Sequence, residues 1–186
     1  MLKRIFDITF VIILLIPCSF FFLLVSLFIF MVSRGSVIHW SKRVGQKNVI
    51  FLMPKFRTMK IDTPQVATHL IKASDYLILG GGLIRKLSLD EIPQLWSILT
   101  GKMSFVGPRP ALFNQDDLIE QRTNIGVDQL VPGLTGWAQI NGRDELSIQE
   151  KVKLDHEYLL NRSFLFDLKI LFLTFEKVIS QKSVSH

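Results

Sequence analysis

The stretch ITFVIILLIPCSFFFLLVSLFIFMVS, residues 8–33, decides how this chain folds. It carries no charged side chain, and it is longer than the roughly 20 residues that a helix needs to cross the hydrocarbon layer. A cleavable signal sequence has a shorter apolar core of about 7–15 residues, followed by small residues at the cleavage site. The stretch therefore predicts a retained membrane helix.

Two features predict that this helix does not simply cross the membrane. Pro17 removes a helix hydrogen bond and clashes with the preceding turn, so it favours a bend there. Basic residues flank the stretch on both sides: Lys3 and Arg4 before it, and Arg34, Lys42 and Arg43 after it. Because Lys and Arg favour the cytoplasmic side, both ends are best satisfied on one side. We expect a re-entrant helix-break-helix over residues 1–34, with an ordinary single span as the alternative.

The rest of the chain, residues 35–186, is expected to form one cytoplasmic catalytic domain. The net charge of +6 suits phosphorylated substrates or anionic lipid. Nucleic acid is not an expected partner, because the sequence has no zinc-finger spacing, RNP-like motif or repeated basic helix. The single cysteine, Cys18, excludes an intrachain disulfide.

The residue pattern of this domain predicts a mainly α fold with minor β. Short strands are expected at residues 37–40 and 49–53, with Gly45 and Asn48 in the turn between them. Residues 132–136 are expected to form a turn-rich loop. Helices are expected over residues 92–99, 116–123, 147–160 and 164–179.

Two of these helices carry further signals. Ser147 and Glu150 fit a capping box at the start of the third. The last, residues 164–179, is strongly apolar with a few lysines and acids. It is expected either to lie as an amphipathic helix in the membrane interface or to pack as a terminal core helix.

The segment RKLSLDEIPQL, residues 85–95, places Asp90 and Glu91 side by side. One interpretation is a capping box in which Ser88 caps a helix and Glu91 reaches back. Pro93 argues against a simple helix start, because it falls where an N–H is needed. The alternative is phosphoryl chemistry, in which one carboxylate attacks phosphorus and the pair binds Mg²⁺ together with substrate phosphate oxygens.

Chemistry on a phosphate ester also needs cations. Arg109 stands out, because Pro108 and Pro110 fix the backbone on either side of it. Arginine is suited to bidentate phosphate contact. The other candidate phosphate-binding cations are Arg85, Lys55 and Arg57. The four histidines are scattered without ligand-like spacing.

In a fixed order, six blocks resemble the bacterial sugar transferases that start glycan assembly on a polyprenyl phosphate, the small monotopic phosphoglycosyl transferases. The blocks are KRIFD (3–7), RVG (43–45), KFRTM (55–59), RKLSLDEIPQL (85–95), GKMSFVGPRP (101–110) and PGLTGWAQINGR (132–143). They extend over most of the chain, which makes the resemblance more specific than any single motif.

The resemblance implies a UDP-sugar donor, undecaprenyl phosphate as the usual acceptor, and Mg²⁺. It matches Asp90 to the family nucleophile and Glu91 to its dyad partner, and it places Gln139 and Arg143 among the substrate-binding residues. The implied reaction is ping-pong, through a phosphosugar held on Asp90. The implied location is the cytoplasmic face of the bacterial inner membrane, with the bilayer and downstream glycosyltransferases as further partners.

Two other functions stay open at this point. The first is a non-enzymatic membrane-anchored scaffold, in which the two acids only cap a helix. The second is a membrane phosphohydrolase, in which water replaces the lipid acceptor. Product analysis with and without polyprenyl phosphate distinguishes the hydrolase from the transferase.

Overall fold

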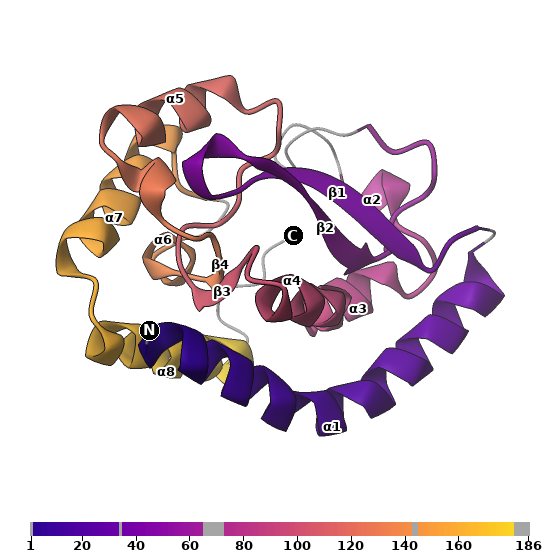
Figure 1. The fold of residues 1–186 in the computed structure, drawn as a ribbon. Coiled ribbons are helices and arrows are strands. Elements are labelled where there is room, and N and C mark those ends of the chain that lie inside the picture. The colour runs from indigo at the N-terminus through magenta and orange to yellow at the C-terminus, as the bar shows by residue number, and fades with distance from the viewer. Residues whose placement is uncertain (1, 34, 65–72, 143–144, 181–186) are drawn as a thin grey trace.

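A computed structural model describes residues 2–33, 35–64, 73–142 and 145–180 (Figure 1). The described chain is mainly helical with two small sheets, as the sequence predicts. The strands are β1 (Ile38–Val44), β2 (Ile50–Phe56), β3 (Ser104–Val106) and β4 (Gly133–Thr135). The helices are α1 (Leu2–Val32), α2 (Ala73–Tyr76), α3 (Gly81–Lys86), α4 (Leu95–Leu99), α5 (Asp116–Asn124), α6 (Trp137–Ile140), α7 (Ile148–Asn161) and α8 (Phe164–Ser180).

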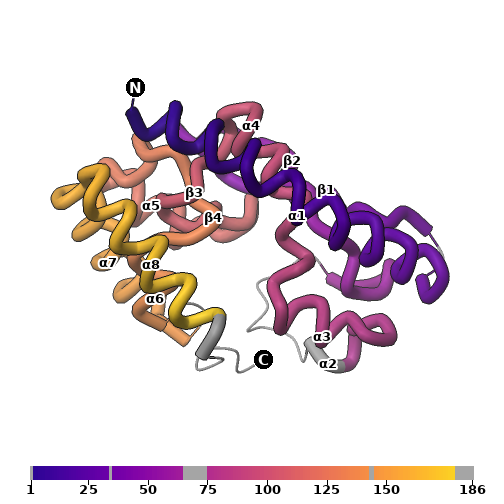
Figure 2. Tube along the Cα trace, turned by 90° about the horizontal axis from the view of Figure 1, so that it is seen from below, coloured from indigo at the N-terminus to yellow at the C-terminus, as the bar shows by residue number. Residues whose placement is uncertain are grey.

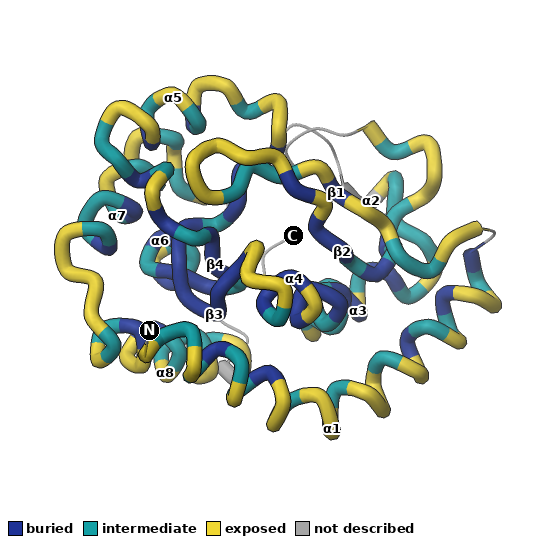
Figure 3. Tube along the Cα trace, viewed as in Figure 1, coloured by how far each residue is buried: buried dark blue, intermediate teal, exposed yellow. Residues whose placement is uncertain are grey.

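Helix α1 packs on the domain along one narrow face. Residues on this face recur every three or four positions, as on one side of a helix: Asp7, Val11, Leu14, Cys18, Phe22, Val25 and Ile29. The remaining apolar side chains of α1 are mostly exposed, and Figure 3 colours exposed residues in yellow along much of the helix. A helix that is apolar all round yet covered on one side suits contact with lipid.

The helix does not break at Pro17. It runs from Leu2 to Val32 with the proline inside it. Figure 1 shows α1 curved around the domain, with both ends turned toward it. Among the described residues, α1 is the one helix long and apolar enough to cross a membrane. The predicted break is therefore a curve, while the re-entrant path and the domain division at residue 34 stay predictions.

Lys3 ties the start of α1 to three other elements. Its Nζ atom lies 2.6 Å from the Asp167 carboxylate on α8, 2.8 Å from the Val106 carbonyl on β3 and 3.1 Å from the Tyr158 hydroxyl on α7. Tyr158 in turn donates to Asp167 at 2.6 Å. This side chain therefore joins elements that are distant in the sequence.

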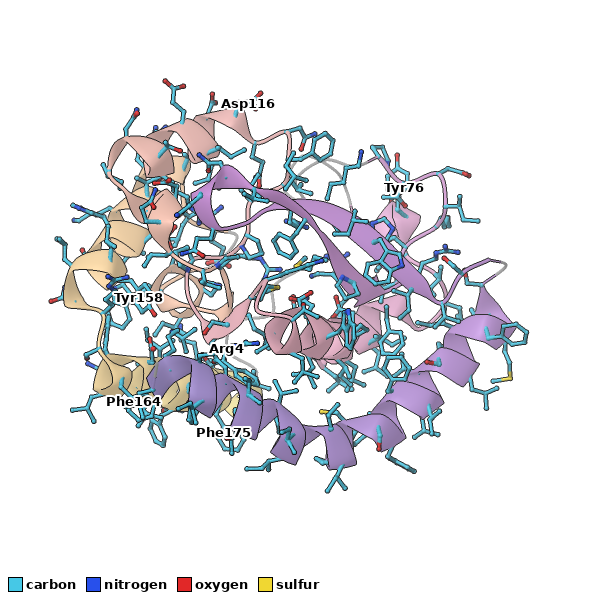
Figure 4. The ribbon with its side chains drawn as sticks, viewed as in Figure 1. Arg4, Tyr76, Asp116, Tyr158, Phe164 and Phe175 are labelled. Carbon is cyan, nitrogen blue, oxygen red and sulfur yellow. The ribbon has the colours of Figure 1, made fainter. Side chains whose placement is uncertain are left out.

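Arg4 and Asp7 extend this anchor. Arg4 donates to the carbonyls of Ile98 and Leu99 at the end of α4, and Figure 4 shows its side chain reaching into the domain. Cations stabilise the C-terminal end of a helix. Asp7 accepts from the Phe105 amide at 3.2 Å. The basic residues before the apolar stretch thus bind the domain, a role beyond the flanking charge expected of them.

The β1–β2 hairpin is longer than predicted. The two strands pair antiparallel from Ile38 opposite Phe56 to Val44 opposite Ile50. Lys47 and Asn48 have φ values of 55° and 59° in the turn, where asparagine is among the best tolerated non-glycine residues. The residues of β2 that face the core are Phe51, Met53 and Phe56.

Residues 132–136 are not only a loop, as predicted. Within them Gly133–Thr135 forms β4, which pairs parallel with β3. Glycine is required here because the backbones meet closely: a Cβ on Gly133 would lie 2.1 Å from the nitrogen of Gly107. The glycine and proline content that indicated a loop instead permits this close strand contact.

Helix α8 packs against the domain with one face and leaves an apolar face exposed, so its place in a membrane interface stays a prediction. Asp167 and Ile170 are buried against the domain, whereas Phe172 and Phe175 are 68% and 66% exposed. Figure 2 shows α8 beginning near the start of α1 and running away from it, and Figure 4 shows Phe175 pointing away from the domain. The two helices thus present apolar side chains on the same side. The capping box of α7 is confirmed by reciprocal bonds between Ser147 and Glu150.

The two faces of α8 predict opposite outcomes for substitution. Replacing Phe172 and Phe175 with serine should leave the melting temperature in detergent nearly unchanged. Because the apolar side of α1 is retained, the variant should bind membranes more weakly in a flotation assay without being released completely. Ile170→Ala is the matched core variant. It should lower the free energy of unfolding by about 2–5 kcal/mol, while the fraction that stays folded should still float with membranes. Unaltered flotation of the double serine variant would refute a lipid contact for this face.

Candidate active site

A cavity of about 430 Å³ lies between β1–β2, the Asp90 segment, the Pro108–Arg109–Pro110 turn, α5 and α6. Seven of the eight residues predicted for the site line it together, and six of them are charged: Lys55, Arg57, Arg85, Asp90, Glu91 and Arg109. Gln139 is also in its wall, and Arg143 lies outside the described residues. The fold thus gathers side chains from several distant segments around one space.

The segment around the two acids does not form the capping box that one interpretation proposed. Residues Leu89–Gln94 form a 3-10 helix, and Ser88 before it has φ 56° and ψ 19° with no capping bond from its side chain. A left-handed backbone is uncommon for a residue other than glycine and is costly. Helix α4 begins after Pro93, as the missing N–H of proline favours.

Glu91 is held by two cations instead of capping a helix. Its Oε1 atom lies 2.9 Å from Lys55 Nζ and 3.2 Å from Arg109 Nη2. Lys55 comes from β2, and Arg109 comes from the turn after β3. These partly buried ion pairs fix Glu91 at the wall of the cavity and bring both cations next to its neighbour.

Asp90 differs from Glu91 in its surroundings. It is only 9% exposed, and within the described part of the chain no hydrogen bond to its carboxylate is found. Burial raises the pKa of Asp90, Lys55 opposes that rise and Glu91 adds to it. Burial likewise lowers the pKa of Lys55, against the attraction of Glu91. Asp90 is therefore a desolvated carboxylate whose charge depends on nearby cations.

The other predicted cations lie farther along the cavity wall. Arg85 contacts the sulfur of Met59 at 3.4 Å and lowers the pKa of Asp90. Arg57 donates to the Ser36 hydroxyl, and its buried Nη1 atom has no hydrogen-bond partner among the described residues. The side-chain nitrogen and oxygen of Gln139 are also buried without a hydrogen-bond partner among the described residues. Buried polar atoms without partners are costly, so these side chains suit a ligand that supplies the bonds.

Several lining residues were missed from the sequence. His39, Ser41 and Arg43 alternate along β1 and face the cavity together. The two-residue period of a strand could have identified this set once the strand was extended. The neighbouring cations Arg57, Arg43 and Lys55 reinforce burial in lowering the pKa of His39. Gln115, Arg122 and Lys151 also line the cavity, and no sequence signal pointed to them.

The carboxylate pair is the natural place for a divalent cation. No group of three or more His, Cys, Asp or Glu side chains suited to a metal occurs among the described residues. Mg²⁺ is commonly held by one or two carboxylates, with phosphate oxygens and water completing the shell. Asp90, whose carboxylate makes no hydrogen bond within the described part of the chain, and Glu91 beside it are donors of this type.

Comparison with known proteins agrees with the resemblance. The sequence profile of the family described as bacterial sugar transferase matches residues 1–181. The uncharacterized sugar transferase EpsL of Bacillus subtilis is 40% identical over 98% of this chain and 90% of its own length.

Longer relatives match with a part of their length. The undecaprenyl-phosphate glucose phosphotransferase of Komagataeibacter xylinus is 38% identical over 97% of this chain and 36% of its own length. The UDP-glucose:undecaprenyl-phosphate glucose-1-phosphate transferase of Escherichia coli is 36% identical over 98% and 41%. With a family profile that matches nearly from end to end, the chain belongs to the bacterial sugar transferase family.

Proposed function

We propose that this protein transfers a sugar-1-phosphate from a UDP-sugar to undecaprenyl phosphate, producing UMP and a polyprenyl diphosphate sugar. The observation that carries the proposal is the buried Asp90 beside a Glu91 that is fixed by Lys55 and Arg109. The names of the Komagataeibacter and E. coli relatives describe transfer of this kind to undecaprenyl phosphate. The reaction opens the membrane stage of glycan assembly, and downstream glycosyltransferases would use its product.

In the first step a carboxylate oxygen of Asp90 attacks the phosphorus next to the sugar. A bond forms between Asp90 and phosphorus, and the bond from phosphorus to the oxygen of UMP breaks, so UMP leaves with that electron pair. Asp90 suits this role because it is desolvated and is not engaged in a hydrogen bond with the described residues. Glu91 is less suited, because both of its cations already hold it.

In the second step the phosphate of the lipid attacks the same phosphorus. The bond to Asp90 breaks, the carboxylate is restored, and a diphosphate links sugar to lipid. Arg109, Lys55 and Arg85 lie where they can bind the phosphate oxygens of both substrates. One site then serves both half-reactions, as a ping-pong order requires.

Asp90 and Glu91 would hold the Mg²⁺ that the family resemblance implies. Bound there, the ion would neutralise phosphate charge and reduce the repulsion between the donor and the attacking carboxylate. Lys55 and Arg109, which form ion pairs with Glu91, would neutralise further negative charge around the dyad. The chain itself thus supplies the nucleophile, its orientation and part of the charge balance.

A membrane location follows from the acceptor and from the apolar surface. The outer side of α1 and the exposed face of α8 lie on one side of the molecule. We place this side in the cytoplasmic leaflet of the bacterial inner membrane, with α1 re-entrant and bent around Pro17. Both ends of α1 turn toward the domain, which supports a helix that enters and leaves on one side. The lipid phosphate would then approach the cavity from the headgroup level.

Replacing Asp90 with asparagine should abolish UMP release from a UDP-sugar, because the amide cannot attack phosphorus. We expect a loss of about a thousandfold or more, measured with membrane-embedded enzyme across a panel of UDP-sugars with undecaprenyl phosphate. Asp116→Asn, on the exposed first turn of α5, is the matched control and should retain activity. Chelation of Mg²⁺ by EDTA should also stop turnover.

Three outcomes of this assay separate the candidate functions. Full activity of Asp90→Asn would contradict the assignment of the nucleophile. Release of free sugar phosphate without lipid would favour the phosphohydrolase. No nucleotide release by the wild-type protein with any donor would favour the scaffold.

The charges around Asp90 predict opposite pH shifts in two variants. The rate should fall with decreasing pH as Asp90 becomes protonated, because only the carboxylate attacks. Lys55 lowers the pKa of Asp90 and Glu91 raises it. The single-turnover rate, plotted against pH, falls on the acid side. Lys55→Met should therefore move this fall to higher pH, and Glu91→Gln should move it to lower pH. Shifts in the same direction would show that a different group controls this fall.

A further inference from the structure

Carbonyl groups attach the backbone of the Pro108–Arg109–Pro110 turn to neighbouring segments. Neither proline has an N–H to donate, so the backbone of the turn has few other means of attachment. Four consecutive carbonyls accept hydrogen bonds: Pro108 from the Gly133 amide at 2.9 Å, Arg109 from Arg122 Nη1 at 2.8 Å, Pro110 from Arg43 Nη1 at 3.2 Å, and Ala111 from the Val44 amide at 2.9 Å. The turn is thus fastened on both sides.

The hydrogen bond to the Arg109 carbonyl comes from the side chain of Arg122. This side chain projects from α5 and lies between that carbonyl and Asp155 on α7. Its Nε and Nη2 atoms donate to Asp155 Oδ2 at 2.9 Å and 2.6 Å, while Nη1 reaches the Arg109 carbonyl. Asp155 is 1% exposed and Arg122 is 9% exposed. All three nitrogens of one planar guanidinium are therefore used, which fixes its orientation.

We infer that Arg122, oriented by Asp155, is a positioning residue that sets where the Arg109 guanidinium meets Glu91. This inference rests on the proposed function for its effect on turnover. The contacts form a continuous series from Asp155 through Arg122 and the Arg109 backbone to Glu91, the neighbour of Asp90. A buried cation placed on a backbone carbonyl of the site thereby links α5 and α7 to the carboxylate pair.

Stability alone is a weak explanation for this pair. Buried ion pairs often contribute little net stability, because the desolvation cost offsets the attraction. Apolar residues could fill the same space between α5 and α7. Only a rigid, forked donor can bind the Asp155 carboxylate and the Arg109 carbonyl together, and lysine lacks that fork. The arrangement suits the placement of the turn better than it suits helix packing.

A double-mutant cycle tests the inference. Arg122→Lys should lower kcat/KM for UMP release about ten- to a hundredfold in the otherwise wild-type protein. In an Arg109→Ala background, the same substitution should lower it by less than about threefold, because the side chain that Arg122 positions is already absent. Should Arg122→Lys fail to fold, Asp155→Asn takes its place in the cycle with the same expectation.

Tyr158→Phe is the matched control. It removes a buried hydrogen bond to Asp167 of 2.6 Å, and Tyr158 makes none of the four hydrogen bonds that hold the turn. If Tyr158→Phe lowers kcat/KM, it should do so by the same factor in the wild-type and in the Arg109→Ala background. If Arg122→Lys also lowers activity by one constant factor in both backgrounds, or has no effect in folded protein, the positioning role is overturned.

A second readout needs no substrate. Amide hydrogen exchange over residues 109–113 should become about tenfold faster in Arg122→Lys, and it should not change in Tyr158→Phe. Unchanged exchange in folded Arg122→Lys would overturn the inference. If the wild-type protein released no UMP at all, the proposed function would fail, and the exchange rates would still decide whether Arg122 holds the turn.

Discussion

Asp90 and Glu91 share a cavity in which burial opposes the charge of Asp90, and the cations around the pair favour that charge. Burial raises the pKa of Asp90, and Lys55 is the largest opposing influence. Segments that are far apart in the sequence place these cations next to Asp90 and Glu91. Strand β2 supplies Lys55, the turn after β3 supplies Arg109, and α3 supplies Arg85. A carboxylate whose pKa is perturbed by burial and by specific charged neighbours is typical of functional sites.

The membrane helix and the site are coupled through packing. One face of α1 covers the core along its whole length, while Lys3, Arg4 and Asp7 bind the domain at its first turns. This arrangement fixes the cavity relative to the apolar surface of α1 and α8 (Figures 2 and 3). An enzyme that joins a water-soluble nucleotide sugar to a lipid phosphate needs such a fixed relation between its site and the membrane.

Local signals in the sequence predicted local structure well. The capping box of Ser147 and Glu150 and the helix of residues 116–123 formed where expected, and the strand pair around Gly45 formed with longer strands than predicted. The parallel β3–β4 pair and the Arg122–Asp155 contact were not predictable, because they join segments far apart and leave no local pattern. The Ser88 capping box failed because long-range ion pairs to Glu91 prevailed over a local bond.

The most direct test is to trap the reaction after its first half. Enzyme incubated with a UDP-sugar labelled in the sugar, without lipid acceptor, should release UMP and keep the label. Peptide mapping should place a phosphosugar on Asp90, and added undecaprenyl phosphate should discharge it into the lipid product. Formation of that product under conditions where no adduct appears on Asp90 would contradict the account.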